Sequence, residues 1–545
     1  MKKYIIIWAV AVLAATSCAD QLDQEPANAI TTEQIREILA SDDEAKIDLI
    51  IGGIANNIPF AIHTITVGGA DVRTNSPLNM QYYNSLLGYD IVCNPVSGYG
   101  YESYSAYNSR RSSVAGHNIP YWQYGWSCVV AANKLLSYLP EVLSTGKVKD
   151  YKARALTLRA YGYNFLMENY RGTYQSSGEG LMIYDKMGEG GAYKGYSTAG
   201  ETYDFIKADL TEAVRLFAES GIGEGSDGYT IANTQDVDLG VANFLLARVS
   251  LLTGDYAAAI AACNSVLAKY PVFIPTAHYG GQNTGDPPGV DGAVPDFAAE
   301  NNAFLNFTDN PEVIFGFPGI DRRDAAANRG YTNVAAEWLN VFGSGYGGSG
   351  SNYGRIVSTL YAAINANDVR KGVFLSGSEQ FLNYVHQFST PATRTIPAYS
   401  NLKWAATSVG GLKTENDITK FDVCYMRSSE VLLMKAEAQA LSGGSGENDA
   451  KTTLNTLLAA RTNTGSPALT CDTYYTGGTS VFDMVKLQWR IEMWGENGLE
   501  YYNNKRWNNP AVRTRASGHD ADVTIGVDLM TLEIPADESL YNPNI

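Results

Sequence analysis

A unit of 34 residues, from 238 to 271, constrains the fold of this chain more than any other segment. Its first half places apolar residues on one helical face, and its second half does so again after a turn at Gly254. The first face contains Val241, Leu245, Arg248 and Leu252, and the second contains Ile260, Cys263 and Leu267. Glycine suits the left-handed backbone that ends a helix, and the Tyr-Pro pair at 270–271 stops the second helix. The unit is therefore predicted to form two helices joined by a tight turn.

The length and layout of this unit resemble those of a tetratricopeptide repeat. A single pair of helices cannot bury both of its faces, so further helices are expected to pack against it. Helical periodicity supplies candidates for these partners at 118–139, 151–170, 203–217, 427–441 and 481–496. The chain is therefore expected to be mainly α-helical, with tetratricopeptide-like helix pairs forming a scaffold.

Long segments rich in Gly, Asn, Ser and Tyr separate the helical blocks, at 52–119, 272–335, 343–354 and 372–419. Loops of this length in a compact protein are usually functional or disordered, and their Tyr and Trp content argues against disorder. Repeat-like helices occur on both sides of the loops, within about 118–271 and 425–510. Residues 18–545 are therefore expected to form a single domain.

The composition excludes some partners and favours others. A formal net charge of -17 argues against nucleic acid, because phosphate backbones are bound by clustered Lys and Arg. The 36 tyrosines suit surfaces that stack on ligands and stay hydrated, although tyrosines also pack between helices. The six cysteines are scattered and form no C-x-x-C pair, so we expect neither a disulfide framework nor a metal cage.

The first 18 residues have the layout of a secretory signal. Lys2 and Lys3 precede an apolar run at 5–15 that is too short to span a bilayer. Cys18 at the end of this segment resembles the acylated cysteine of bacterial lipoproteins, although Ala15 stands where leucine is usual. Residues 1–17 are therefore expected to be a lipoprotein signal peptide, with Cys18 as the lipid attachment site. The acidic residues that follow resemble an export signal of surface lipoproteins, and they also suit a flexible tether.

The last third of the chain contains several phrases that resemble the SusD/RagB family. The segment 426–438 is similar to its Arg-x-x-Glu-Val-Leu-Leu-x-x-Ala-Glu-Ala helix. Further similar phrases occur at 489–498, 505–507 and 534–545, with weaker ones at 158–161, 310–315 and 368–370. One departure is Asn497, which stands between a Glu and a Gly that are usually adjacent in the family.

The helix in this block is expected to serve the scaffold. Val431, Met434, Ala438 and Leu441 share one helical face. Arg427 and Glu430 are three residues apart, a spacing that lets side chains meet on a helix. The Arg and Glu residues of this block are therefore predicted to pair with one another in the core, and not to contact ligand.

The resemblance implies a nutrient-binding lipoprotein of the outer membrane that faces the extracellular side. Helix pairs would support a ligand-binding face made of loops within about 52–119 and 272–419. The resemblance also implies a SusC-like TonB-dependent outer-membrane barrel as partner, and polysaccharide utilisation as the setting. Family ligands are commonly oligosaccharides and sometimes peptides, and their binding requires no cofactor. A peptide-binding or protein-docking repeat scaffold of the same complex is the main alternative.

The sequence contains no motif that indicates an enzyme. No G-x-S-x-G or H-E-x-x-H motif occurs, and the five histidines are widely separated. The G-x-G-x-x-G match at 345–350 lies in a Gly- and Ser-rich stretch without a strand before it. We therefore expect no catalysis and no metal. A glycan-degrading enzyme stays open, because a pair of glycosidase carboxylates is identified only by its separation in space.

The predicted ligand contacts come from two aromatic loops. In starch-binding members of the family, ligand contacts come from a loop after the first helices and from a second loop in the middle of the chain. The corresponding regions here, 99–107 and 338–353, interleave aromatic residues with Gly and Ser, which lets a backbone approach a ligand closely. Predicted stacking residues are Tyr99, Tyr101, Trp338 and Tyr346, with Arg110 as a hydroxyl or carboxylate partner. The alternative is that these rings fill only their own loops.

Overall fold

The computed structural model describes residues 31–41, 43–52, 58–63, 84–92, 112–114, 118–143, 145–187, 193–222, 234, 236–281, 302–317, 354–383, 392–404, 422–475, 477–519 and 521–545. Helices dominate this part of the chain, as the sequence predicts. The longer ones are α9 (Asn118–Tyr138), α10 (Gly146–Tyr170), α11 (Ala199–Ser220), α12 (Leu239–Leu252), α13 (Tyr256–Lys269), α17 (Ser428–Leu441), α18 (Gly446–Ala460) and α20 (Val481–Glu492). No described helix has the length and apolar character needed to cross a membrane.

Shorter helices complete this framework: α2 (Thr32–Leu39), α3 (Glu44–Ile47), α5 (Ile58–His63), α15 (Ser358–Ala363), α19 (Cys471–Tyr474), α21 (Leu499–Arg506) and α22 (Ala536–Tyr541). The described strands form antiparallel pairs. These pairs are β1 (Ile91–Val92) with β3 (Arg355–Ile356), β2 (Val313–Phe317) with β6 (Val423–Arg427), β4 (Glu379–Asn383) with β5 (Ala392–Ile396), and β7 (Ala511–Arg513) with β8 (Val523–Ile525). Each pair joins parts of the chain without building a large sheet.

The predicted helix pair at 238–271 is present as α12 and α13. The Asp238 carboxylate caps α12 by accepting from the backbone N–H of Val241 at 3.1 Å, and Asp255 caps α13 in the same way. Gly254 has a φ of 81°, so it makes the left-handed turn between the helices. The backbone carbonyl of Asp238 also accepts from the N–H of Ala242, four residues further along the chain.

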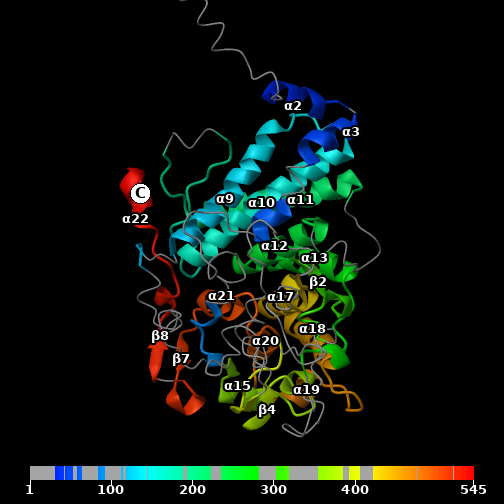
Figure 1. Ribbon diagram of the computed structural model, residues 1–545, viewed down its shortest axis with the longest axis vertical. Coiled ribbons are helices and arrows are strands. Elements are labelled where there is room, and N and C mark those ends of the chain that lie inside the picture. Colours follow the sequence, from blue (N-terminus) through cyan, green and yellow to red (C-terminus); the bar gives the residue numbers. More distant parts are fainter. Residues whose placement is uncertain are drawn as a thin grey trace, which may run out of the picture.

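The helices stack in a continuous series. Helices α9, α10 and α11 pack side by side, α12 and α13 follow, and α13 packs on α17, which packs on α18 and α20 (Figure 1). Residues of α13 that are buried in this stack are Ala259, Ala262, Cys263 and Val266. The apolar stripe therefore lies slightly to one side of the predicted one, because Ile260 and Leu267 are only partly buried.

The helix predicted from the 426–438 phrase is α17, with one correction at each end. Val431, Met434 and Ala438 are buried as expected, but Leu441 is 37% exposed because it lies in the last turn. Arg427 belongs to β6 and precedes the helix, so its side chain is not in helical register with Glu430. The predicted contact between these two side chains on one helix is therefore wrong.

Candidate functional site

The predicted ligand contacts and the lipid attachment site lie outside the described residues. These are Tyr99, Tyr101, Arg110, Trp338, Tyr346 and Cys18. The structure does describe the strands that adjoin the two aromatic loops in sequence. Their arrangement, together with the cavities of the helical scaffold, provides the geometry that bears on function.

The two aromatic loops are attached to neighbouring strands. Strand β1 ends at Val92, and β3 begins at Arg355; these two residues are register partners in an antiparallel pair. The last described residue before the first predicted loop therefore lies beside the strand that follows the second predicted loop in sequence. Tyr99 follows Val92 by seven residues, which span at most about 25 Å when extended.

The segment 84–92, which carries β1, is held by side chains of the C-terminal helices. Arg490 of α20 donates to both oxygens of Asp90, at 2.5 and 3.0 Å, and lies over the ring of Tyr89. Glu500 of α21 accepts from the backbone N–H groups of Tyr89 and Asp90, at 2.6 and 3.2 Å. Burial raises the pKa of Glu500 to about 8, and the nearby carboxylate of Asp90 adds to the shift. The segment that precedes the first predicted loop is therefore held by specific polar contacts.

Close packing adds to this anchor. A side chain at Gly88 would collide with the carboxylate of Glu500. Arg513 of β7 donates to the carbonyl oxygens of Gly88 and Leu86, at 2.9 and 2.5 Å. Because these contacts come from residues more than 400 positions away, the base of the loop depends on the fold of the whole C-terminal part.

A buried cluster of arginines and glutamates forms several short ion pairs in the described part of the chain. Arg427 lies 2.8 Å from Glu312 and 2.7 Å from Glu492. Arg461 contacts the same two carboxylates, at 2.6 and 2.9 Å. All four side chains are at most 1% exposed. Burial opposes the ionisation of Glu492, but the arginines around it outweigh that effect and hold its pKa well below the usual range.

Further charges extend this cluster. Arg370 lies 2.6 Å from Asp368 and 3.1 Å from Glu492. Lys403 lies 2.5 Å from Glu496 and also donates to the backbone carbonyls of Glu492 and Trp494. Burial lowers the pKa of Lys403 to about 8, and Glu496 opposes that shift.

The geometry of this cluster is that of a structural core. A glycosidase needs one carboxyl group with a raised pKa that faces its substrate. Glu312 and Glu492 instead both have lowered pKa values, and both are closed off from solvent. The prediction that the Arg and Glu residues of this block serve the scaffold agrees with the contacts of Arg427, although its partners are Glu312, Glu492 and Glu496, and not Glu430.

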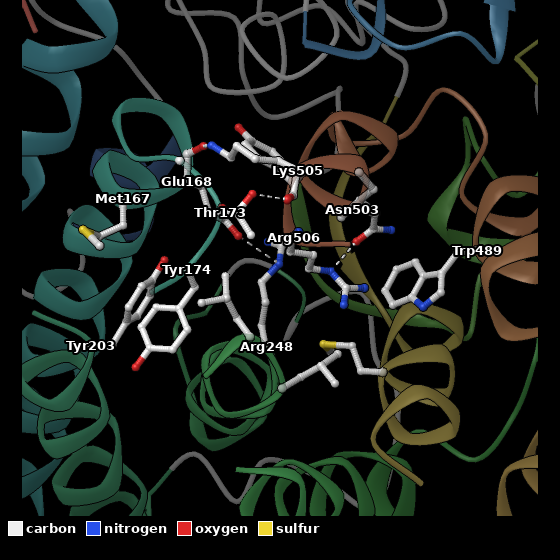
Figure 2. Close-up of a pocket in the computed structure, with 16 residues that line it drawn as sticks. Met167, Glu168, Thr173, Tyr174, Tyr203, Arg248, Trp489, Asn503, Lys505 and Arg506 are labelled. Atoms are coloured by element: carbon white, nitrogen blue, oxygen red, sulfur yellow. Dashed lines mark hydrogen bonds and ion pairs between the residues drawn. The ribbon is translucent and has the colours of Figure 1, made fainter. Parts of the chain in front are cut away.

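A cavity lies among the helices α10, α11, α12, α17, α20 and α21 (Figure 2). Arg248 rises from α12 into its centre, with Glu168 of α10 above it and Trp489 of α20 at the side. The inner space measures about 40 Å³. It adjoins an outer cleft of about 370 Å³, and the two share the wall residues Met167, Gly172, Thr173, Tyr174 and Tyr203.

The far wall of this cavity is built by two basic residues of α21. Lys505 donates to the backbone carbonyls of Glu168 and Arg171, and the carbonyl of Lys505 accepts from Thr173 at 2.8 Å. Burial lowers the pKa of Lys505 to about 7. Arg506 pairs with Glu437 in a bidentate contact. Of the two, Arg506 is thus neutralised by a carboxylate, whereas Lys505 is held by carbonyl dipoles.

One residue of the sequence, Arg248, could have indicated this cavity. Arg248 is a charged residue within the apolar stripe of the predicted helix at 238–252. A charge at such a position needs a partner or a polar space, because burying it alone is costly. The other lining residues come from segments far apart in the chain, so their meeting could not be inferred from spacing.

Two family models match the chain. One, described as starch-binding associating with outer membrane, matches residues 22–222, and the model of the SusD family matches residues 374–528. No curated protein sequence gives a significant match. Solved structures with the same fold share 16–20% sequence identity with this chain.

Three of these structures illustrate the similarity. A SusD-like carbohydrate binding protein from Bacteroides vulgatus is 19% identical, with a TM-score of 0.66 over 94% of this chain and 97% of its own. A SusD superfamily protein from Bacteroides thetaiotaomicron is 20% identical, with a TM-score of 0.62 over 92% and 98%. Surface glycan-binding protein A from the same organism, in complex with laminarihexaose, is 16% identical, with a TM-score of 0.61 over 91% and 98%. On its motifs and the two family models, which together match residues 22–222 and 374–528, this chain belongs to the SusD/RagB family.

Proposed function

We propose that this protein is a surface lipoprotein that binds an oligosaccharide and delivers it to a SusC-like TonB-dependent outer-membrane transporter. It binds its ligand without chemical change and uses no cofactor. The acylated Cys18 holds it in the outer membrane, and the ligand face is directed to the extracellular side. The matching family model is described by association with the outer membrane, which supports this location.

The observation that carries the proposal is the shared fold with proteins described as carbohydrate or glycan binding, one of them solved with laminarihexaose. Membership of the family supports binding over catalysis. The pairing of β1 with β3 adds local support, since both aromatic loops are attached to the scaffold at that pair. Aromatic rings suit sugars because the apolar C–H face of a pyranose stacks on them.

Within the aromatic loops, Tyr99, Tyr101, Trp338 and Tyr346 are proposed to stack on sugar rings. Arg110 is proposed to bond hydroxyl groups or a carboxylate of the ligand. Exposed platforms of this kind contribute little to the core, so their loss should affect binding and leave folding intact. A single domain comprising residues 18–545 would place these loops on one scaffold.

The experiment is calorimetric titration of the purified mature protein with a panel of soluble oligosaccharides, including laminarihexaose, followed by chromatography of each mixture. Saturable heat with unchanged oligosaccharide is the expected result. Heat accompanied by shorter products would replace the proposal with a glycan-degrading enzyme. No heat with any oligosaccharide, but heat with peptides, would replace it with a peptide-docking scaffold.

A further inference from the structure

The guanidinium of Arg248 has unused hydrogen-bonding capacity in the inner cavity. Its closest carboxylate oxygens belong to Glu168 at 3.5 Å and Glu430 at 3.4 Å. These are ion pairs, but neither has hydrogen-bond geometry, and Arg248 makes no hydrogen bond to any other described residue. The side chain is only 18% exposed. A guanidinium carries five donors, so Arg248 presents several of them to the cavity that it lines.

The two carboxylates beside Arg248 also make no side-chain hydrogen bond within the described part of the chain. Both oxygens of Glu430 are buried without a hydrogen-bond partner among the described residues. The carboxylate of Glu168 lines the cavity, and it too makes no hydrogen bond within the described part of the chain. The Arg427 cluster is different, because there each carboxylate receives several short contacts. The longer ion-pair distances are therefore a local feature of the surroundings of Arg248.

The shape of the space suits a small ring. The inner cavity, at about 40 Å³, holds only a few water-sized groups, since one water needs roughly 10–15 Å³ measured in this way. The outer cleft, at about 370 Å³, falls in the range of small-molecule sites, roughly 300–1,000 Å³. Tyr174 and Tyr203 stand where the two spaces meet, with ring centroids 5.4 Å apart and planes at 80°. A ring in the cleft would therefore meet aromatic groups and could extend polar groups toward Arg248.

The charges select a neutral ligand. An anion near Arg248 would also meet the carboxylate of Glu168, and a cation near Glu168 would meet Arg248 and Lys505. A hydroxyl group donates to a carboxylate and accepts from a guanidinium at the same time. Only a neutral group of this kind satisfies both sides of the pair without leaving an uncompensated charge.

We propose that the cleft and inner cavity between α10, α11, α12 and α21 form a second binding site, which takes one neutral polyhydroxylated ring such as a single sugar unit. The ring lies in the outer cleft beside Tyr174, and one hydroxyl-bearing edge enters the inner cavity between Arg248 and Glu168. This site is separate from the aromatic loops and does not depend on the proposed function of those loops.

The test is ligand-observed NMR on the full mature protein, with methyl glycosides of glucose, galactose, mannose and xylose as neutral probes and glucuronate and glucosamine as charged ones. Three variants are compared: Tyr174→Ala at the cleft, Arg248→Lys in the cavity, and Tyr193→Ala as a control. The side chain of Tyr193 is 50% exposed on a segment that does not line the cleft. Melting temperatures establish that each variant is folded.

We expect at least one neutral glycoside to bind the wild type, and the charged probes to bind more weakly. Tyr174→Ala and Arg248→Lys should each reduce affinity by about tenfold or more, the effect of losing one anchor, while Tyr193→Ala leaves it unchanged. Failure of every neutral probe to bind, or equal binding by folded Tyr174→Ala and Arg248→Lys, would overturn the proposal and leave water as the occupant. Should Arg248→Lys not fold, Tyr174→Ala decides alone.

The experiment distinguishes the failure of the second-site proposal from the failure of the proposed function. Trp338→Ala should weaken binding of an oligosaccharide such as laminarihexaose without changing the binding of single-ring probes. Tyr174→Ala should do the reverse. Loss of the proposed second site would therefore be seen as absent single-ring binding alongside intact oligosaccharide binding.

Discussion

At the residue scale, buried charges are the distinctive feature of this scaffold. Placing an arginine or glutamate in the interior costs several kcal/mol, and partners must offset that cost. Around Arg427 and Arg461 the compensation is dense, with contacts of 2.6 to 2.9 Å. Around Glu430 it is thin, with one ion pair at 3.4 Å. The two environments should therefore respond differently to substitution.

Replacing Arg427 with Met should destabilise the protein strongly. The change leaves Glu312, Glu492 and Glu496 with one fewer cation each, and breaking a buried pair costs roughly 3–5 kcal/mol. Thermal melting followed by differential scanning fluorimetry measures the effect. The control is Arg215→Met, because Arg215 is 51% exposed and such pairs contribute about 1 kcal/mol or less. Equal melting temperatures for the two variants would show that the cluster does not stabilise the fold.

Glu430 should make stability depend on pH. Burial raises its pKa from 4.5 to about 7, with Arg248 opposing the shift. Because the folded pKa is the higher one, the stabilising effect of protonation is complete below pH 4.5 and is lost as the pH rises through 7. Glutamine cannot ionise and lacks this dependence.

The stability of the wild type relative to Glu430→Gln should therefore fall by about 2–3 kcal/mol between about pH 5 and about pH 8. Urea denaturation of both proteins across that range gives the difference, in which the other titrating groups largely cancel. A difference that stays constant with pH would mean that Glu430 is ionised throughout.

At the element scale, local sequence patterns were sufficient to predict structure where residues that are close in sequence are also close in space. The helix pair at 238–271 was predictable because Val241 and Leu245 repeat at helical spacing and Gly254 adopts the required positive φ. Arg427 could not be predicted in the same way. Its position suggested a partner three residues away, whereas β6 directs it to residues 65 to 115 positions distant.

Two neighbouring substitutions on α13 test how this element packs. Cys263 is fully buried against the stack that includes α17, and Ala261 is exposed on the opposite side. Cys263→Asp places an unpaired carboxylate in an apolar site, so the variant should lose several kcal/mol or fail to fold. Ala261→Asp should melt within a few degrees of the wild type. Circular dichroism melts of both variants compare the two faces, and similar behaviour would contradict the packing of α13 on α17.

At the scale of the whole molecule, the sequence predicted the class of fold but not how distant parts meet. The pairing of β1 with β3 joins positions about 91 and 356, and no local pattern specifies such a contact. The cavity around Arg248 likewise combines residues from 167 to 506. The predicted ligand contacts in the aromatic loops stay predictions, since they depend on residues outside the described part of the chain.

Membrane attachment is a property of the whole mature protein and depends on Cys18. Cys18→Ala should prevent acylation, because the lipid is attached to the thiol of Cys18 and alanine has no thiol. The protein should then move from washed membranes to the soluble fraction, as measured by immunoblotting of both fractions in cells without the transporter. Continued recovery of the variant in washed membranes would contradict lipid anchoring at this residue.

The central claim is that the aromatic loops bind an oligosaccharide, and calorimetric titration of the wild type beside Trp338→Ala and Tyr101→Ala tests it most directly. The wild type should bind at least one oligosaccharide of the panel. Each variant should bind that ligand more weakly by about 1–3 kcal/mol, the effect of truncating an aromatic anchor, with an unchanged melting temperature. A wild type that binds no oligosaccharide would contradict the function, and variants that bind as tightly as the wild type would contradict the site.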